Sequence, residues 1–312
     1  MSSEIYFFPY PGLGDFIMAS PFFNAAINEH KEREHILIVR DDCRFTNIIK
    51  EFIPFDRVLI FDKRNYWKRL RLFFRLRKMD IDIIVNFHHS PRFIPFFKMI
   101  SKKVFSSHSF NTIHPYKISE KLFQKMNIKV HNLKIHINLP SNAEKKAKDW
   151  LLENDMENKD FFMFIPGSFD EKRRYPIERW KKIANFLNEQ YPGKSIIANL
   201  GPWEKELEKE LSEFGIKVFT RKDISTLAGL IHKSLLVISN DTGPLHLAYS
   251  LDKKCIGLMK RTGHITSHPY SQYAKAIYPL GSCNLDCDNC SIKCVEDIKI
   301  DKILEEIKKQ EL

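Results

Sequence analysis

The sequence contains no apolar run that approaches the roughly 18 residues of a membrane-spanning helix. Near its beginning, Glu4 leads directly into the strand-like segment IYFFPY, without the basic region, apolar core and cleavage site of a secretory signal. Short-period repeats and low-complexity tracts are absent as well. We therefore expect a cytoplasmic protein that does not cross a bilayer.

Acidic residues are the scarcer charge, with 39 Asp and Glu against 50 Lys and Arg, a formal net charge of +11 and a pI near 9.2. Such an excess of positive charge favours anionic partners, namely phosphates, acidic lipid surfaces or nucleic acid. No recognisable nucleic-acid-binding module accompanies the charge, so we do not expect nucleic acid to be the partner.

Residues 63 to 79, KRNYWKRLRLFFRLRKM, concentrate eight basic side chains without one acid and interleave them with aromatic residues and leucines. Two interpretations are open at this point. The segment is either a surface that binds the anionic inner face of the cytoplasmic membrane, or a solvated basic helix that covers its own sheet.

Strand-like and helical patterns alternate along the whole chain of 312 residues, which is long enough for two domains. This alternation predicts an α/β protein built from two doubly wound parallel sheets with crossover helices. The polar segment 139 to 159 predicts the join, giving domains 1–150 and 151–312. Ligands bind at the carboxyl ends of such strands, so those ends carry the candidate sites.

The first strand end is PYPGLGDFIMASP, residues 9 to 21. Gly12 and Gly14 permit a tight turn that brings backbone close to a ligand, and Asp15 follows at or next to a helix N-terminus. Asp15 is either a plain N-cap or a carboxylate that faces a cleft and removes a proton from a substrate hydroxyl. Position 17 is Ile where a dinucleotide fingerprint needs a small residue, so a nicotinamide site is weakly supported.

Two strand ends in the second half carry charged residues beside glycine. Ser168 ends the turn Pro166-Gly167-Ser168, and three cations that suit a phosphate follow it, Lys172, Arg173 and Arg174. Glu204 stands just past Gly201, where its carboxylate either accepts hydrogen bonds from ribose hydroxyls or satisfies a helix N-terminus.

The segment VISNDTGPLHLAYSL, residues 237 to 251, gathers an acid, a hydroxyl, a bare turn and an imidazole at one strand end. If Pro244 is the first helical residue and Gly243 the cap, the amides of the first turn are free to bind an anion. We expect Thr242, the Gly243 backbone and His246 to hold a diphosphate, with Asp241 contacting hydroxyls of the attached group. The alternative for His246 is a buried structural histidine.

GLGDFIMASP, PGSFDEKRRYP and above all SNDTGPLHLA followed by IGLM resemble, in order, motifs of glycosyltransferase family nine, the heptosyltransferases of lipopolysaccharide synthesis. The resemblance implies a GT-B fold, in which two Rossmann-like domains face a central cleft, the first binding the acceptor and the second the nucleotide sugar. It further implies an inverting transfer, without a metal or other cofactor, of heptose from an ADP-heptose donor to an inner-core sugar of a lipid-anchored lipopolysaccharide acceptor.

The resemblance also assigns roles to residues. Asp15 matches the general base of the family, Thr242, Gly243 and His246 match diphosphate contacts, and Asp241 matches a contact to the donor sugar. Where the family has Lys two residues before an aromatic-Pro pair, this chain has Arg173, with Lys172 adjacent. Either cation could neutralise the leaving diphosphate. His88 and His89, at the end of another strand, either shape the acceptor site, serve as a substitute base or are simple polar lining.

Four of the six cysteines form a cluster spaced C-x3-C-x2-C-x3-C, namely Cys283, Cys287, Cys290 and Cys294. Thiolates in the cytosol suit a structural zinc or iron ion, while free cysteines or a disulfide are the alternatives. Fewer than twenty residues follow, too few for the barrel of a radical iron–sulfur enzyme. The final segment reads as an amphipathic helix that, in GT-B folds, packs back across the first domain.

Two other functions compete with heptose transfer. The same fold could use another nucleotide sugar, or a capsule or protein acceptor. Alternatively, the chain could be a catalytically silent sugar-nucleotide-binding assembly protein held together by the cysteine cluster. The presence of Asp15, Asp241 and His246 argues against a silent protein.

Overall fold

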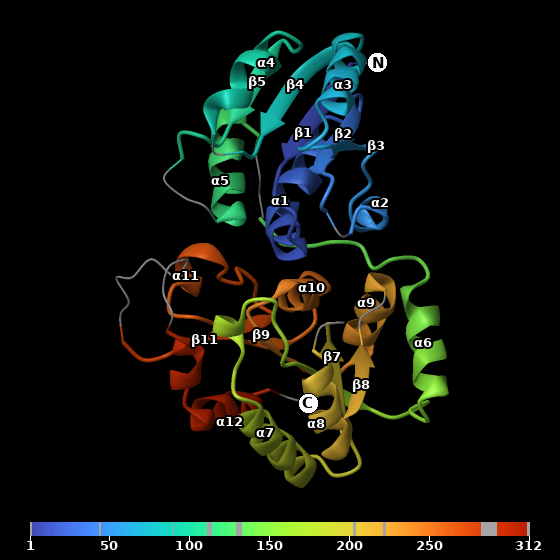
Figure 1. Ribbon diagram of the computed structural model, residues 1–312, viewed down its shortest axis with the longest axis vertical. Coiled ribbons are helices and arrows are strands. Elements are labelled where there is room, and N and C mark those ends of the chain that lie inside the picture. Colours follow the sequence, from blue (N-terminus) through green and yellow to red (C-terminus); the bar gives the residue numbers. More distant parts are fainter. Residues whose placement is uncertain are drawn as a thin grey trace. The chain divides into compact units, whose positions relative to one another are not determined.

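The computed structural model describes residues 2–43, 45–88, 90–110, 114–128, 133–201, 204–220, 223–281 and 292–310. The chain forms two compact units, Met1–Asn138 and Leu139–Leu312. Both units are layered structures in which helices cover a parallel sheet (Figure 1). The prediction of two doubly wound α/β domains is therefore confirmed.

The second unit begins earlier than the predicted boundary at residue 150 because helix α6 (Ala143–Glu153) packs on helix α9 (Ile224–Lys233). The two helices approach closely at Gly229, where an added Cβ would lie 2.1 Å from the carbonyl oxygen of Ala143. Lys146 also pairs with Asp223 at 3.0 Å, at the N-terminus of α9. Because of these contacts, helix α6 belongs to the second unit, although it lies in the polar segment that predicts the join.

The first unit contains a five-stranded parallel sheet in the order β3-β2-β1-β4-β5. Its strands are β1 (Ser3–Phe8), β2 (Glu34–Arg40), β3 (Arg57–Phe61), β4 (Ile81–Asn86) and β5 (Lys103–Ser106). The order reverses after β1, which pairs with both β2 and β4. The carboxyl end of β1, where Asp15 follows, is therefore the edge at which such sheets bind ligands.

Alternation of side chains along β1 builds a core on each face of this sheet. Ile5 and Phe7 pack with residues of α3 (Tyr66–Arg77), η1 (Pro91–Phe93) and α4 (Ile94–Lys98). On the other face, Tyr6 and Phe8 contact Phe22 and Phe23 of α1 (Leu13–Glu29), which packs against α5 (Pro115–Met126). A short helix, α2 (Ile49–Phe52), precedes β3.

The second unit contains a six-stranded parallel sheet in the order β11-β10-β9-β6-β7-β8. The strands are β6 (Phe161–Ile165), β7 (Ser195–Leu200), β8 (Lys217–Thr220), β9 (Val237–Asn240), β10 (Cys255–Leu258) and β11 (Ala274–Ile277). The remaining helices are η2 (Glu171–Arg173), α7 (Ile177–Gln190), α8 (Lys205–Glu213), α10 (Gly243–Ser250), α11 (Gly263–Thr266), η3 (Cys294–Asp297) and α12 (Ile300–Lys308). Strands β6 and β9 are neighbours at the centre, so their carboxyl ends lie side by side.

The C-terminal helix α12 buries Ile303 and Ile307 in the core of the second unit, where it contacts α7 and β11. The buried side of this helix therefore packs within the second unit, and not on the first domain as expected. In the part of the chain that the structure describes, no helix combines the length and apolarity needed to span a bilayer.

Candidate functional site at the strand ends

Asp241 lies directly after β9 and is completely buried. Its Oδ2 atom accepts a hydrogen bond from Ser267 Oγ at 2.8 Å and lies 3.4 Å from Arg173 Nη1. Arg173 Nη1 also donates to the Asp241 carbonyl oxygen at 3.2 Å. Asp241 Oδ1 has no hydrogen-bond partner among the described residues and lies 3.8 Å from His246 Nε2.

The carboxyl of Asp241 is held ionised by its neighbours. Burial by itself raises its pKa, but His246, Arg173 and the Ser267 hydroxyl more than offset that effect, so the pKa lies below its ordinary value. A buried carboxylate with one uncommitted oxygen can accept hydrogen bonds from hydroxyl groups of a ligand.

His246 is also buried, and its Nδ1 atom lies 2.5 Å from the hydroxyl of Tyr249, one turn further along α10. This contact fixes the ring so that Nε2 faces Asp241. Sequence reasoning treated ligand contact and structural burial of His246 as alternatives. The ring is buried, as in the structural alternative, yet Nε2 is aimed at the acid of the candidate site.

Helix α10 begins one residue earlier than expected, because Thr242 is its N-cap, Gly243 its first residue and Pro244 its second. Thr242 has extended backbone angles, and its Oγ1 donates to the Asn240 carbonyl at 3.3 Å. Thr242 and Gly243 are partly exposed, whereas Pro244 is buried. The first-turn amide of Gly243 is thus available at the strand end, as anion binding requires.

Asn240, which sequence reasoning did not single out, ties the neighbouring segments together. Its Nδ2 atom donates to the Pro166 carbonyl at 2.5 Å, and its Oδ1 atom accepts from the Tyr175 amide at 3.2 Å. These bonds connect the end of β9 to the turn after β6 and to the segment that carries Arg173. Asn240 therefore brings the cation to the acid.

Of the two candidate cations, Arg173 is the one that contacts Asp241. Lys172 precedes it in η2 and is partly exposed, with its backbone N–H bonded to Asp170 Oδ1 at 3.0 Å. Arg174 points elsewhere, because its Nε donates to the Ser168 carbonyl at 2.8 Å. Ser168 itself is buried.

Glu204 is the N-cap residue of α8, but its side chain does not cap the helix. Instead, Oε2 accepts from the Gly201 amide at 2.7 Å, and the carboxylate leans against Gly167, where an added Cβ would lie only 2.0 Å from Oε2. Oε1 is buried, has no hydrogen bond from the described part of the chain and lies 3.8 Å from Arg174. The lack of a side chain at Gly167 therefore makes room for a second buried carboxylate at the strand ends.

In the first unit, Asp15 is the third residue of α1, and the N-cap is Gly12. The plain N-cap interpretation of Asp15 is therefore wrong. An added Cβ at Gly12 would lie 2.5 Å from Asp15 Oδ2, so the carboxylate folds back over the glycine. Burial, with a smaller contribution from the Asp15 charge, raises the pKa of Tyr10 well above its ordinary value. Gly14, the second residue of α1, directly precedes Asp15 and is partly exposed.

His88 follows β4 and is partly exposed. Its Nδ1 atom accepts a hydrogen bond from the Ser90 amide at 2.8 Å. Three of the four clustered cysteines, Cys283, Cys287 and Cys290, lie outside the described residues, as does His89. Cys294 is described and buried, and its Sγ atom accepts from the Arg261 amide at 3.4 Å. Over the described ranges, no group of acids, histidines and cysteines could hold a metal ion.

Two Rossmann-like units with a cluster of acid, cation and helix end at the carboxyl edge of a sheet define a GT-B type protein. Comparison with known families gives a consistent result. The family model of glycosyltransferase family 9 (heptosyltransferase) matches residues 117–295, more than half of the chain. The chain belongs to this family and is a glycosyltransferase.

Individual relatives agree over nearly the whole length. Lipooligosaccharide heptosyltransferase 2 of Campylobacter jejuni is 27% identical, over 95% of this chain and 96% of the relative. A family 9 glycosyltransferase from Veillonella parvula has a TM-score of 0.81 at 18% identity, covering 98% of this chain and 96% of that one. An E. coli heptosyltransferase solved with ADP-2-deoxy-2-fluoro heptose has a TM-score of 0.71 at 16% identity, covering 98% and 99%. The solved structures support the fold.

Proposed function

We propose that the protein transfers a heptose, with inversion, from ADP-heptose to an inner-core sugar of a lipid-anchored lipopolysaccharide. The buried Asp241 carboxylate, with Arg173, His246 and the start of α10 beside it, carries this proposal. The names of the relatives support it, since they include a lipooligosaccharide heptosyltransferase and a heptosyltransferase bound to an ADP-heptose analogue.

In this proposal the second unit binds the donor. The Gly243 amide, the Thr242 hydroxyl and His246 would contact the diphosphate, as the anion-binding end of α10 suggests. Asp241 Oδ1, which has no hydrogen bond from a described residue, would accept hydrogen bonds from sugar hydroxyls. Glu204 Oε1, buried in the same way, would accept from the ribose, and Ser168 and Pro244 would line the pocket.

The reaction itself is a single displacement. Asp15 would take the proton of the acceptor hydroxyl while the hydroxyl oxygen bonds to the anomeric carbon. The bond from that carbon to the diphosphate breaks, and ADP leaves with its electron pair. Arg173, rather than Lys172, would stabilise the charge that grows on ADP, because its guanidinium lies beside Asp241. The step as written uses protein groups alone and needs no metal.

We further propose a structural zinc or iron ion held by Cys283, Cys287, Cys290 and Cys294. The spacing of the four thiols supports this site. Its test is the metal content of protein purified without added ions. One ion per chain is expected, and a metal-free, fully folded protein would overturn the proposal.

Ligand-dependent thermal unfolding tests the proposed donor. ADP-heptose should raise the melting temperature more than UDP- or GDP-linked sugars at the same concentration, because a ligand of the native state stabilises it. Transfer to an inner-core acceptor follows as the second measurement. Stabilisation only by another nucleotide sugar would indicate a different donor. Binding without transfer to any saccharide would indicate a silent assembly protein and overturn the proposal.

A further inference from the structure

Helix α3 packs one side onto the first sheet and leaves the other unpartnered within its unit. Leu76 is buried in the core cluster, with Leu72 and Phe73 packed beside it. Asn65 caps the helix by accepting a hydrogen bond from the Lys68 amide at 3.0 Å, which fixes where the helix starts. The packed side explains the leucines of the segment but not its exposed aromatic residues.

The opposite side is an unusual mixture for a solvated surface. Trp67 is 75% exposed and Phe74 is 51% exposed, although large apolar side chains normally avoid such exposure when they lie close together. Arg71, Arg75 and Lys78 share their side of the helix, because residues spaced by three, four, seven or eight positions align along an α-helix. We call Trp67, Arg71, Phe74, Arg75 and Lys78 the basic-aromatic stripe.

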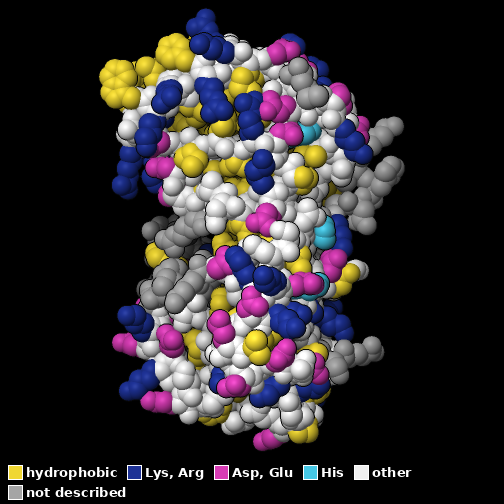
Figure 2. All heavy atoms as spheres, turned by 90° about the vertical axis from the view of Figure 1, so that its right-hand side faces the viewer, with side chains coloured by type: hydrophobic (Ala, Val, Ile, Leu, Met, Phe, Trp, Pro, Cys, Tyr) yellow, Lys and Arg dark blue, Asp and Glu magenta, His cyan; other side chains and the backbone are white. Residues whose placement is uncertain are grey.

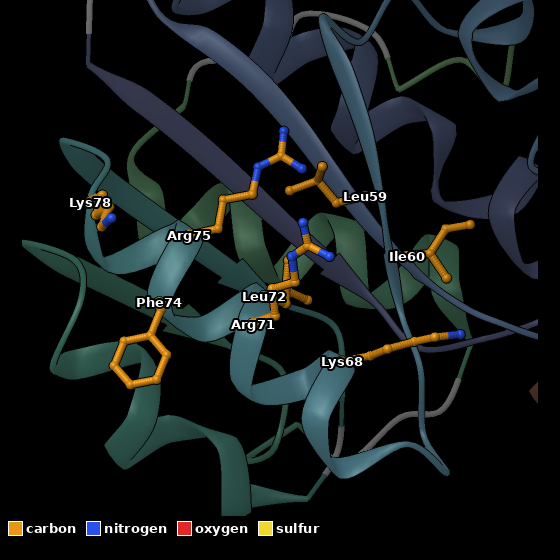
Figure 3. A pocket seen from close by; sticks show the side chains of 8 residues that line it. All are labelled: Leu59, Ile60, Lys68, Arg71, Leu72, Phe74, Arg75 and Lys78. Carbon is orange, nitrogen blue, oxygen red and sulfur yellow. The ribbon is translucent and has the colours of Figure 1, made fainter.

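A groove of about 620 Å³ runs beside the stripe, between α3 and the edge strand β3. It is lined by Leu59, Ile60, Lys68, Arg71, Leu72, Phe74, Arg75 and Lys78. Figure 3 shows Arg71 and Arg75 pointing from α3 toward Leu59 in the strand, whereas Phe74 points away from the strand. Ile60 of the strand is itself 53% exposed. The groove thus combines cations with an apolar floor.

The positive charge of the stripe is not neutralised within its unit. Lys68 pairs with Asp62 at 3.1 Å, but in the described part of the chain Arg71, Arg75 and Lys78 form no ion pair. Figure 2 shows dark-blue basic side chains beside yellow hydrophobic ones on the first unit, drawn at the top. A partner for this face must therefore supply negative charge and accept apolar side chains at the same time.

We propose that the basic-aromatic stripe docks the protein on an anionic phospholipid bilayer. Aromatic side chains of such a helix insert at the level of the headgroups, and its arginines bind the phosphates, a combination that a bilayer of acidic lipids satisfies. Nucleic acid would satisfy the charge but offers no hydrocarbon layer to the exposed side chain of Ile60. The observations therefore favour lipid.

The position of α3 fits this role. The helix begins just after the carboxyl end of β3. In a parallel sheet the carboxyl ends of all strands lie on the same side, and Gly12 and Asp15 follow the carboxyl end of β1 on that side. Trp67, in the first turn, is thus on the edge where a lipid-anchored acceptor would arrive. Only this step depends on the proposed function, because vesicle binding is measurable without donor or acceptor.

Co-sedimentation of the full-length protein with vesicles tests the proposal. We expect binding to phosphatidylglycerol–phosphatidylcholine vesicles, weakened by salt, and little binding to phosphatidylcholine alone. R71Q/R75Q should weaken the partition coefficient by about thirtyfold, since each basic residue near such a surface contributes about five- to sixfold. W67S/F74S should weaken it by about tenfold or more through the lost apolar insertion.

The matched control is K145Q/K217Q, which removes the same charge from exposed positions of the second unit. It should bind vesicles like the wild type. Equal losses for R71Q/R75Q and this control would reduce the effect to net charge and overturn the proposal. So would stripe variants that bind vesicles normally but lose binding to single-stranded polynucleotide. Unchanged thermal unfolding and unchanged turnover on a water-soluble acceptor are expected for all three variants.

Discussion

The guanidinium of Arg173 lies 3.4 Å from the buried carboxylate of Asp241, although 68 residues separate them in the sequence. Arg173 comes from the turn after β6, and Asp241 ends the neighbouring strand β9. The pair thus joins the two central strands at their carboxyl ends. Asp241 has no exposed surface, whereas Arg173 keeps 30% of its side chain exposed. The charge of Asp241 therefore depends on Arg173 for stabilisation, while water can stabilise the charge of Arg173.

Replacing Arg173 by Ala should therefore affect both stability and turnover. The variant leaves a buried carboxylate without its nearest full charge, which we expect to lower the free energy of unfolding by about 2 kcal/mol, less than for a fully buried pair because water reaches Arg173. Turnover should fall by about 100-fold or more if Arg173 stabilises the leaving ADP. Urea unfolding and steady-state kinetics measure the two effects separately.

Two companion variants separate charge from packing. R173K keeps a positive charge and should recover part of both losses. S267A removes the hydrogen bond to Asp241, together with a longer one to Thr266 Oγ1 at 3.4 Å, and should cost about 1 kcal/mol of stability, with a much smaller effect on turnover. If R173A turned over at the wild-type rate, the proposed role of Arg173 would be lost, whatever its stability.

The fit between Gly167 and Glu204 leads to a second prediction. In G167A the new methyl group would stand 2.0 Å from Glu204 Oε2, so the carboxylate must leave its position beside the Gly201 amide. We expect ADP-linked ligands to bind at least ~10-fold more weakly, because a hydrogen bond to a charged acceptor contributes about 1.5 to 3 kcal/mol. Isothermal titration with ADP measures the change.

A double-mutant cycle shows whether the loss passes through the carboxylate. Truncation of Glu204 to Ala should weaken ADP binding to a similar extent. G167A should then add little in the E204A background, since the clashing group is gone. Additive losses would mean that Gly167 acts through the turn itself and not through Glu204.

Asp15 is the subject of a third prediction. D15N keeps the size of the side chain but cannot take a proton, so we expect normal folding and turnover at least ~100-fold slower. Thermal unfolding and a transfer assay check the two statements. D80N, which alters an exposed acid of the same unit, is the matched control and should transfer sugar normally. Near-normal turnover of D15N would exclude Asp15 as the base.

Periodicity and strand-end residues predicted the two parallel sheets. The NDTGPLH segment contains the acid, the helix end and the histidine that the structure brings together at the candidate site. What sequence could not decide was orientation. Lys172 and Arg173 are consecutive in η2, and contacts from distant parts of the chain, such as the Tyr175 amide donating to Asn240, position Arg173 against Asp241. Ser267, 26 residues past Asp241, follows a short helix and belongs to no recognisable pattern.

The sequence also showed no sign that helix α6 packs within the second unit. Helix α6 reads as polar because most of its residues are charged, but Ala143, Ala147 and Leu151 form a narrow buried row that packs on α9. A small-residue contact of this kind depends on the partner Gly229, far away in sequence. Composition of one segment alone therefore gives no sign of it.

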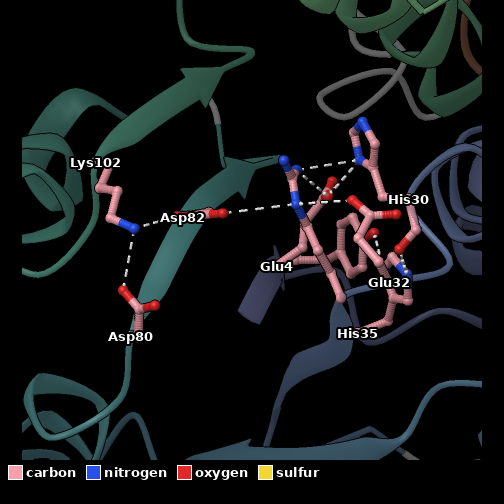
Figure 4. A network of polar contacts seen from close by, with 9 residues as sticks. Glu4, His30, Glu32, His35, Asp80, Asp82 and Lys102 are labelled. Atoms are coloured by element: carbon pink, nitrogen blue, oxygen red, sulfur yellow. Dashed lines mark hydrogen bonds and ion pairs between the residues drawn. The ribbon is translucent and has the colours of Figure 1, made fainter. Parts of the chain in front are cut away.

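A buried polar network near the amino end of β1, opposite the carboxyl ends that carry the candidate residues, was not predicted either. Glu4, completely buried, accepts from His30 Nδ1 at 2.6 Å and from Arg33 at 3.3 Å. His35 lies beside it, with Nε2 3.0 Å from the His30 carbonyl and Nδ1 2.7 Å from the Tyr6 hydroxyl (Figure 4). A carbonyl can only accept, so Nε2 carries a proton. Burial lowers the pKa of His35 and so favours the neutral ring, in which Nδ1 accepts from the Tyr6 hydroxyl.

This arrangement predicts a loss of stability in mild acid. Burial lowers the pKa of His35 in the folded protein below 6.5, despite the opposing charge of Glu4. As the pH falls below about 6.5, His35 in the unfolded chain gains a proton that it does not gain in the folded protein. The free energy of unfolding therefore falls by at most about 1.4 kcal/mol per pH unit, until the pH reaches the pKa of His35 in the folded protein. H35Q lacks this group, so its stability deficit relative to the wild type should shrink between pH 7.5 and pH 5.5. Urea unfolding at both pH values measures the deficit, and a constant or growing difference would show that His35 is not the group responsible.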